Sequence, residues 1–423
     1  MRARLLLSLL ALAACTTSAA HDELPGVEVS RSDVAFTPSA SASDLAAVVA
    51  ADTAFALDLV SAAGTDHNLI VSPFSIATAL GMLEPGARGA TRAEMATVLH
   101  ETLVDEQLHP ARGALLAALA DQPAVSEELP PPFTLRAHNM VWAQRDYPIL
   151  GPYLDVLAAS YDAGLARLDF GSDPDAARIT INDAVAEQTE QRIEDLIPEG
   201  VITDLTRLVL TNAVYFRANW LNEFDPEQTS DGVFHTASGS EVTVPMMSIS
   251  ALFDYADGDG YAAARLPYVG DASMMVLLPD LDLPDLIERL TVEEITAARE
   301  RAASFQVDLT MPRFEFRTQL GLADVLQALG MRSAFVPPPG PGSADLTGIV
   351  ETPELFVQDV VHQGFVAVDE KGTEAAAATA VIAGATSMPP TATLILDRPF
   401  LFLIQHDATG EILFAGVVAD PAT

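Results

Sequence analysis

One segment near the C-terminal end constrains the fold more than any other feature of this chain. The stretch from Gly372 to Met388 contains no proline, no aromatic residue and a single charge, that of Glu374. Small residues dominate it, and Pro389 and Pro390 follow directly. Because alanine is the best helix former, the segment could be a helix, and its small polar residues would also suit an exposed flexible linker.

The same segment also fits a β-strand. Alternate side chains of a strand point to opposite faces, so the single charge lies on one face and the other face is uncharged throughout. Proline, which would break a hydrogen-bonded ladder, occurs only past the end. We interpret the segment as a strand that can insert between two strands of an existing sheet. The uncharged face would carry Thr373, Ala375, Ala377, Thr379, Val381 and Ala383, and the other face Glu374, Ala376, Ala378, Ala380 and Ile382.

The rest of the chain shows helical periodicity early and strand patterns late. This order favours an α+β fold with large sheets over alternating βαβ units. No linker-like break follows residue 42, so residues 43–423 are interpreted as one domain, with Ser43 capping its first helix. Helices are expected near 44–62, 75–83, 91–99, 176–197, 283–302 and 320–329, and strands near 133–144, 208–216, 242–247, 261–267, 274–279, 305–316, 356–368, 393–405 and 411–418.

The first residues form an export signal. Arg2 and Arg4 precede the apolar run Leu5–Ala14, which is too short to cross a bilayer and fits the core of a secretory signal. The run ends at Cys15, and the residues before it resemble a bacterial lipobox, in which the cysteine receives lipid. We therefore expect a signal peptide over 1–14, a lipid-anchored flexible tether over 15–42, and a location in the cell envelope, in the periplasm or at the cell surface. The alternative is an ordinary signal cleaved near Ala20, which would make the protein fully extracellular.

Charge and cysteine content exclude several kinds of partner. Twenty-two basic residues face 59 acidic ones, giving a net charge of -37, and Lys371 is the only lysine. Such a surface repels nucleic acid and anionic lipid, so the anchor is the only membrane contact expected. The single cysteine rules out an internal disulfide and a cysteine-rich zinc site.

The sequence contains no motif that indicates an enzyme. The chain lacks Gly-x-Ser-x-Gly, His-Glu-x-x-His, a phosphate-binding loop and Gly-x-Gly-x-x-Gly. Its eight histidines are scattered. We therefore expect no catalytic residues, no metal site and no cofactor.

Several motifs together resemble the serpin family. The stretch from Val360 to Thr379 resembles the serpin hinge and reactive-centre loop, and the likeness extends over nearly the whole folded part. The other matching segments are 68–76 (NLIVSPFSI), 86–100 (GARGATRAEMATVLH), the helix around Ile181-Asn182, 210–220 (LTNAVYFRANW) and 397–400 (DRPF).

The resemblance implies a serpin fold with three β-sheets, eight or nine helices and an exposed reactive-centre loop. It implies a suicide-type inhibitor that traps a serine protease as a covalent acyl-enzyme, acting as a monomer. Family spacing places the scissile bond at Thr386-Ser387, with Met388 as the rival position, and a small residue such as Thr386 suits elastase-like or subtilisin-like targets. The alternative is a non-inhibitory serpin acting as a chaperone, carrier or scaffold; a lipid-anchored enzyme and a surface adhesin fit less well.

The resemblance also assigns roles to individual residues. Trp220 resembles the breach tryptophan of the family, although simple core packing would also explain a tryptophan here. A shutter network of polar residues would control opening of the central sheet, and a hinge of small residues would insert quickly. The shutter comprises Ser72, Ser75, Asn182 and His362, and the hinge Glu370, Gly372, Thr373, Glu374, Ala375, Ala376, Ala377, Ala378 and Thr379.

Overall fold

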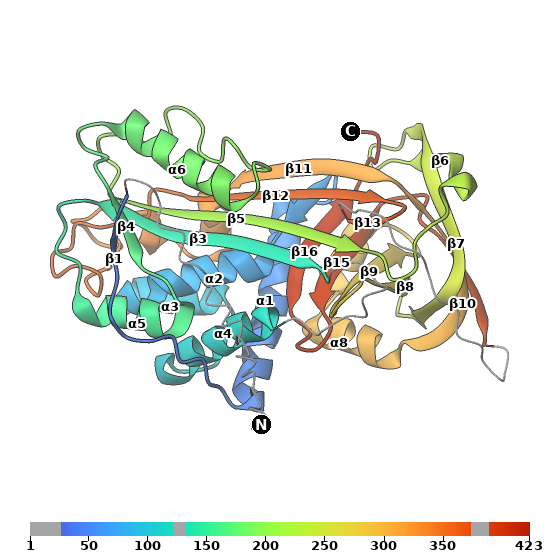
Figure 1. The fold of residues 1–423 in the computed structure, drawn as a ribbon, viewed down its shortest axis with the longest axis horizontal. Helices are drawn as coiled ribbons and strands as arrows, with labels where there is room; N and C mark the ends of the chain where they lie inside the picture. The colour runs from blue at the N-terminus through green and yellow to red at the C-terminus, as the bar shows by residue number, and fades with distance from the viewer. Residues whose placement is uncertain (1–26, 122–131, 374–388) are drawn as a thin grey trace, which may run out of the picture.

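A seven-stranded sheet runs through the length of the molecule (Figure 1). The computed structural model describes residues 27–121, 132–373 and 389–423, and the predicted signal peptide and Cys15 lie outside them. Most neighbouring strands of this sheet are antiparallel, whereas β3 and β4, and β5 and β12, pair in parallel. In spatial order the strands are β1 (Glu28–Ser30), β4 (Leu165–Leu168), β3 (Thr134–Gln144), β5 (Leu208–Asn219), β13 (Gly372–Thr373), β12 (Val360–Asp369) and β11 (Phe314–Gly321).

A second sheet has nine strands. Its longest strand, β7 (Glu241–Asp257), pairs with β6 and β10 along most of its length and with β8 at its end. The family resemblance implies three β-sheets. In the described residues β7 hydrogen-bonds strands on both of its sides, so two of these sheets are joined into one. The remaining strands are β2 (Leu69–Val71), β6 (Ser230–His235), β8 (Tyr261–Pro267), β9 (Ala272–Pro279), β10 (Ala303–Pro312), β14 (Thr391–Ile395), β15 (Phe400–His406) and β16 (Ile412–Val418).

The described residues form nine α-helices, which confirms the α+β class. In Figure 1 α6 lies on one side of the seven-stranded sheet, and α1 to α5 lie on the other. Helix α1 is long and apolar enough to suit a membrane span, but eight of its residues are buried in the domain. The helices are α1 (Ala42–Ala63), α2 (Pro73–Leu83), α3 (Gly89–Val98), α4 (Asp105–Ala120), α5 (Gly151–Tyr161), α6 (Pro174–Gln188), α7 (Leu283–Arg289), α8 (Val292–Arg301) and α9 (Leu322–Leu329).

Both faces of the seven-stranded sheet are covered by apolar contacts. Helix α6 packs on one face and α2 on the other, which explains why the central strands read as continuous apolar runs rather than as alternating ones. Side chains toward α6 include Trp142, Val209 and Val361, and side chains toward α2 include Val141, Leu210 and Val360.

Several expected elements have different ends in the structure, among them the strand expected over 393–405, which is two strands, β14 and β15. The helix expected over 283–302 is two helices, because the Thr291 hydroxyl accepts a hydrogen bond from the Glu294 amide and caps a new helix. The strand expected over 305–316 divides between β10 and β11 at Arg313, and the helix expected over 176–197 ends at Gln188.

The predicted tether is wrong for its second half. Residues 28–30 form β1, which extends the sheet beside β4, and Thr37 donates a backbone hydrogen bond to Ala159. Arg31 forms an ion pair with Asp162. The cap of α1 is Ser41 rather than Ser43. The domain therefore includes residues 28–30 and Thr37. A three-residue strand is too short to produce a recognisable pattern in the sequence.

Replacing Gly164 by alanine should release residues 27–36 from the domain. An added Cβ would lie 2.8 Å from the Ser30 carbonyl oxygen, and a backbone atom cannot move aside cheaply. We expect trypsin to cut after Arg31 about 10-fold faster, because pairing of β1 normally restricts access. Mass spectrometry of timed digests would measure this rate.

Gly151→Ala is the matched control, since nothing lies within 4 Å of its added Cβ. Equal cleavage rates at Arg31 in both variants would contradict the packing of this arm against β4.

Candidate functional site

The first two residues of the segment that is predicted to insert lie inside the sheet. Gly372 and Thr373 form β13, which pairs antiparallel with Asp369 and Val368 of β12 on one side, and with Asn219 and Ala218 of β5 on the other. Farther along, β5 and β12 pair directly in parallel over residues 360–364 and 210–214. The rest of the predicted hinge, from Glu374 to Thr379, and the predicted bond Thr386-Ser387 lie outside the described residues.

Glycine is required at position 372. A Cβ there would lie 2.1 Å from the Ala218 carbonyl oxygen, and the φ angle of +155° is one that other residues rarely adopt. The chain can therefore turn from β12 into β13 only because residue 372 has no side chain.

Trp220 holds this turn in place, at the position predicted for the breach. Its backbone amide donates to the Lys371 carbonyl (2.8 Å), and its Nε1 donates to the Asp369 carbonyl (3.0 Å). The indole stacks on Tyr268, with ring centroids 4.4 Å apart. The Tyr268 hydroxyl forms a hydrogen bond of 2.6 Å with the Thr373 hydroxyl. The hinge therefore starts from a fixed, buried position.

Glu370 anchors the same turn by its charge. Arg313 Nε donates to the Glu370 carboxylate (2.7 Å), and the Thr229 hydroxyl donates to the same oxygen. Partial burial alone would raise the pKa of Glu370, but the hydrogen bonds from Arg313 and Thr229 outweigh burial and lower this pKa below its ordinary value. Glu370 is therefore an ionised anchor at neutral pH.

A buried polar network joins β5 and β12 where they pair directly. His362 accepts a hydrogen bond from the Ser72 amide at Nε2 (3.2 Å) and contacts Asn212 Oδ1 through Nδ1 (2.5 Å). Asn212 donates to Ser75 (2.7 Å) and to Asn139 (2.7 Å). These contacts link α2, β3, β5 and β12, so the strands cannot separate without breaking them.

One residue that was predicted for the shutter lies outside this network. Asn182 lies on α6, where its amide donates to the Ile197 carbonyl (3.0 Å) and accepts from the Ile197 amide (2.9 Å). Its prediction as a shutter residue is wrong, since both ends of its amide fix the chain after α6. Asn212 takes that place beside Ser75 and His362. The sequence feature that could have identified Asn212 is an amide side chain inside the otherwise apolar run 208–216.

The part of the chain that the structure describes shows no metal site beside this arrangement. Within residues 27–121, 132–373 and 389–423, no group of three or more His, Cys, Asp or Glu side chains converges where a metal ion could bind.

The free energy of unfolding should depend on the protonation of His362. Burial lowers the pKa of His362 to about 3, whereas histidine in an unfolded chain titrates near 6.5. The unfolded chain therefore binds the extra proton first, and stability falls as pH drops below about 6.5. Between pH 7 and pH 5 this effect should cost about 2 kcal/mol.

Urea unfolding of wild type and His362→Gln at both pH values would measure this cost. The variant should lose about 2 kcal/mol less than wild type over this range, because glutamine does not titrate. Identical losses in the two proteins would show that His362 does not carry the pH dependence.

Comparisons with known proteins agree with the family resemblance of the sequence. A family model described as "Serpin (serine protease inhibitor)" matches residues 50–421. An uncharacterised serpin-like protein of Thermococcus kodakarensis is 38% identical over 380 residues, covering 88% of this chain and 86% of its own. The leukocyte elastase inhibitor of Homo sapiens is 35% identical over 390 residues, covering 88% and 98%. The native structure of tengpin, a thermophilic serpin, has the same fold, with a TM-score of 0.79 at 24% identity, covering 93% of this chain and 100% of tengpin. The chain therefore belongs to the serpin family of serine protease inhibitors.

Proposed function

We propose that this protein is a suicide-type inhibitor that traps its target as an acyl-enzyme. The serine oxygen of the protease attacks the Thr386 carbonyl carbon, the bond to Ser387 breaks, and the Ser387 amine takes up a proton and leaves. An ester then joins Thr386 to the protease. Insertion of the cut loop between β5 and β12 carries the protease away before water can hydrolyse the ester.

The observation that carries this proposal is the position of β13. Gly372 and Thr373 already pair with both neighbours in the orientation that an inserting strand needs. Continuing the same register would place Thr379 between His362 and Asn212. Insertion therefore requires the direct pairing of β5 with β12 to open, and the polar network controls that opening.

The free energy released by insertion is large enough to move the attached protease. About 14 inserted residues at roughly 3.3 Å each would move the protease by on the order of 45 Å. Roughly a dozen new ladder hydrogen bonds, each contributing about 0.5–1.5 kcal/mol, supply on the order of 10 kcal/mol. This is comparable to the stability of a whole domain, so the uncut protein is metastable and is maintained by kinetics.

The target class follows from the small residue before the proposed bond. Thr386 is uncharged and follows Gly384 and Ala385, which suits the narrow, neutral specificity pocket of elastase-like and subtilisin-like proteases. Relatives named leukocyte elastase inhibitors, at 35–36% identity, support this class. A basic residue, which trypsin-like enzymes need, is absent from 372–388.

Mixing the chain from residue 16 onward with pancreatic-type elastase or subtilisin should give a covalent band on a denaturing gel. The band should have the summed mass of protease and inhibitor, less the released fragment that begins at Ser387. Thr373→Arg is the control: position 373 is 2% exposed and cannot accept a charged side chain, so this variant should be cut at the same bond without a covalent band.

Cleavage of the wild-type protein without a covalent band, and without a gain in heat stability after cutting, would overturn the inhibitory mechanism. That result would favour a non-inhibitory chaperone, carrier or scaffold.

We further propose that Cys15 carries lipid and holds a monomeric inhibitor in the cell envelope. The position of the only cysteine directly after the apolar run 5–14 supports this location. Wild type expressed in a bacterial host should partition into the detergent phase of a Triton X-114 extraction, whereas Cys15→Ser should remain in the aqueous phase. Equal partitioning of the two proteins would favour an ordinary cleaved signal and a fully extracellular protein.

A further inference from the structure

Two buried carboxyl groups converge on one arginine nitrogen beside the α3–α4 connection, residues 99–104. Arg92 Nη1 lies 2.9 Å from Glu84 Oε1 and 3.0 Å from Glu101 Oε2. Glu84 begins the short helix η1 (Glu84–Gly86) after α2, and its carboxyl group is within hydrogen-bonding reach of that of Glu101. The two side chains are 0% and 1% exposed. If both were ionised, two negative charges would be buried side by side.

The charges around this pair do not balance when every group is ionised. Arg92 and Arg112 are the cations, and the carboxyl groups buried with them are those of Asp52, Glu84 and Glu101. Three carboxylates beside two guanidinium groups leave one negative charge in excess, and burying an uncompensated charge is strongly unfavourable. Among the described residues no three such side chains converge as metal ligands, which favours a proton over a metal ion as the missing positive charge.

The hydrogen bonds place this proton on the pair rather than on Asp52. Asp52 accepts a hydrogen bond from Arg112 Nη1 (3.1 Å), as an ionised carboxylate does. Among the described residues no group donates a hydrogen bond to either oxygen of Glu84 or to Glu101 Oε1. A protonated Glu84 donates to Glu101 and thereby satisfies one buried oxygen on each side. Burial and the neighbouring Glu101 both raise the pKa of Glu84 above its ordinary value.

Other ionisable groups that face the pair leave this charge count unchanged. His109 on α4 and Tyr161 on α5 are neutral at pH 7, because burial lowers the pKa of His109 to about 4 and raises that of Tyr161. Glu411, which precedes β16 and interacts with Asp52, is neutral as well, because burial raises its pKa far above the ordinary value. Glu84 and Glu101 are therefore the two buried carboxyl groups that share a proton.

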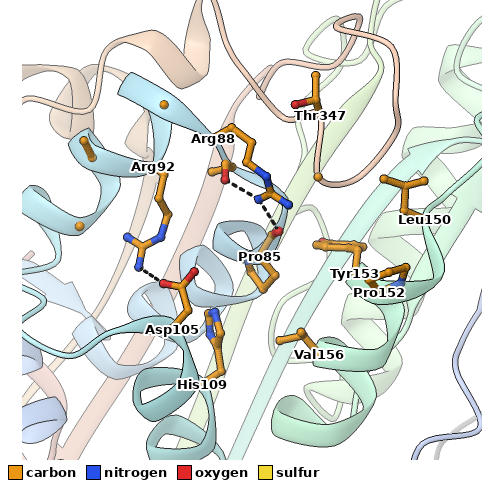
Figure 2. Close-up of a pocket in the computed structure, with 15 residues that line it drawn as sticks. Pro85, Arg88, Arg92, Asp105, His109, Leu150, Pro152, Tyr153, Val156 and Thr347 are labelled. Carbon is orange, nitrogen blue, oxygen red and sulfur yellow. Dashed lines mark hydrogen bonds and ion pairs between the residues drawn. The ribbon is translucent and has the colours of Figure 1, made fainter.

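Solvent reaches the pair through a cavity of about 790 Å³ between α3, α4 and α5. Figure 2 shows Arg92 and Asp105 at the edge of this cavity, joined by an ion pair, with His109 beside them. Asp105 is 57% exposed, whereas Arg92 contacts both carboxyl groups of the pair. A base in solution can therefore remove the proton without unfolding the domain.

The pair also fixes the α3–α4 connection. Leu99 is fully buried, and His100, with a φ angle of +52°, turns the chain sharply before Glu101. His100 Nε2 lies 2.7 Å from Asp58 Oδ2 on α1, so the connection is held at two points, by α1 and by the pair. Ionisation of Glu84 would repel Glu101 and weaken the second of these contacts.

We propose that Glu84 and Glu101 share one proton that holds the α3–α4 connection closed, and that rising pH opens the connection by removing this proton. In the open, solvated connection Glu84 returns to the ordinary glutamate pKa of about 4.3. The closed form therefore binds the proton more tightly, and the closed form is lost progressively as pH rises from that value toward the raised pKa of Glu84. This contact is separate from the hinge and does not depend on protease inhibition.

Infrared spectroscopy in D2O tests the shared proton, because the C=O stretch of a protonated carboxyl group is separate from the carboxylate bands. At pH 7, Glu84→Gln should remove intensity equal to one protonated carboxyl group. Glu101→Gln should remove the same intensity, because the remaining buried carboxylates then balance the two guanidinium groups. Glu106→Gln is the matched control, an exposed glutamate on α4 that should leave this intensity unchanged.

Hydrogen exchange measured by mass spectrometry on peptides covering 99–108 tests the opening. After correction for intrinsic exchange rates, the opening constant of the wild type should rise by up to about 10-fold per pH unit between pH 6 and pH 8. Glu84→Gln should remove this rise, because its amide group donates to Glu101 at every pH. Glu106→Gln should keep the wild-type response, and His100 and Asp52 are present in all three proteins.

Two results would overturn the proposal. The first is unchanged intensity of protonated carboxyl groups in either Glu84→Gln or Glu101→Gln. The second is the same pH dependence of opening in the wild type and in Glu84→Gln. Both substitutions keep the size and shape of the side chain, and if Glu84→Gln does not fold, the infrared spectrum of Glu101→Gln decides the matter.

Discussion

Direct pairing between β5 and β12 is the interaction on which the rest of the structure depends. It joins the half of the sheet that contains β3 and β4 to the half that contains β11. Apolar contacts cover both faces but are not directional, so they would tolerate a sheet with one more strand. The hydrogen bonds of His362 and Asn212 are directional and are made across the closed pair. The network therefore favours the closed sheet, while β13 already marks where the next strand would enter.

Buried carboxyl groups elsewhere change the free energy of unfolding with pH in the opposite direction to His362. Asp52 and Arg112 form an ion pair of 3.1 Å with side chains 0% and 2% exposed, and burial raises the pKa of Asp52 to about 6. Burial also raises the pKa of Glu84 and Glu411. These carboxyl groups hold protons in the folded state that the unfolded chain has released, so their contribution to stability is lost as pH rises toward and beyond 6. His362 contributes in the opposite sense, so the two effects partly cancel as pH rises from about 4 to about 6.5.

At the three predicted hinge residues that the structure describes, chemistry leaves few choices of side chain. Gly372 must lack a Cβ, Thr373 must be small enough to bury, and Glu370 must reach Arg313. Asn182 was misassigned because both asparagines lie in amphipathic or apolar segments, and only the packing of β5 against α2 shows that Asn212 faces Ser75. The arm at 28–30 and the cavity beside α3 depend on contacts between segments distant in the chain, which have no local periodicity.

The position of β1 also determines where the proposed lipid anchor would join the domain relative to the hinge. Through β4 and β3, β1 is aligned with Leu208–Leu210 of β5, whereas β13 pairs with Ala218 and Asn219 at the other end of that strand. These two ends are separated by about 30 Å at roughly 3.3 Å per residue (Figure 1). The spacer from residue 16 to residue 26 spans at most about 40 Å when fully extended. In a chain tethered through Cys15, the tether would join the domain at the β1 end of the sheet, about 30 Å from the hinge.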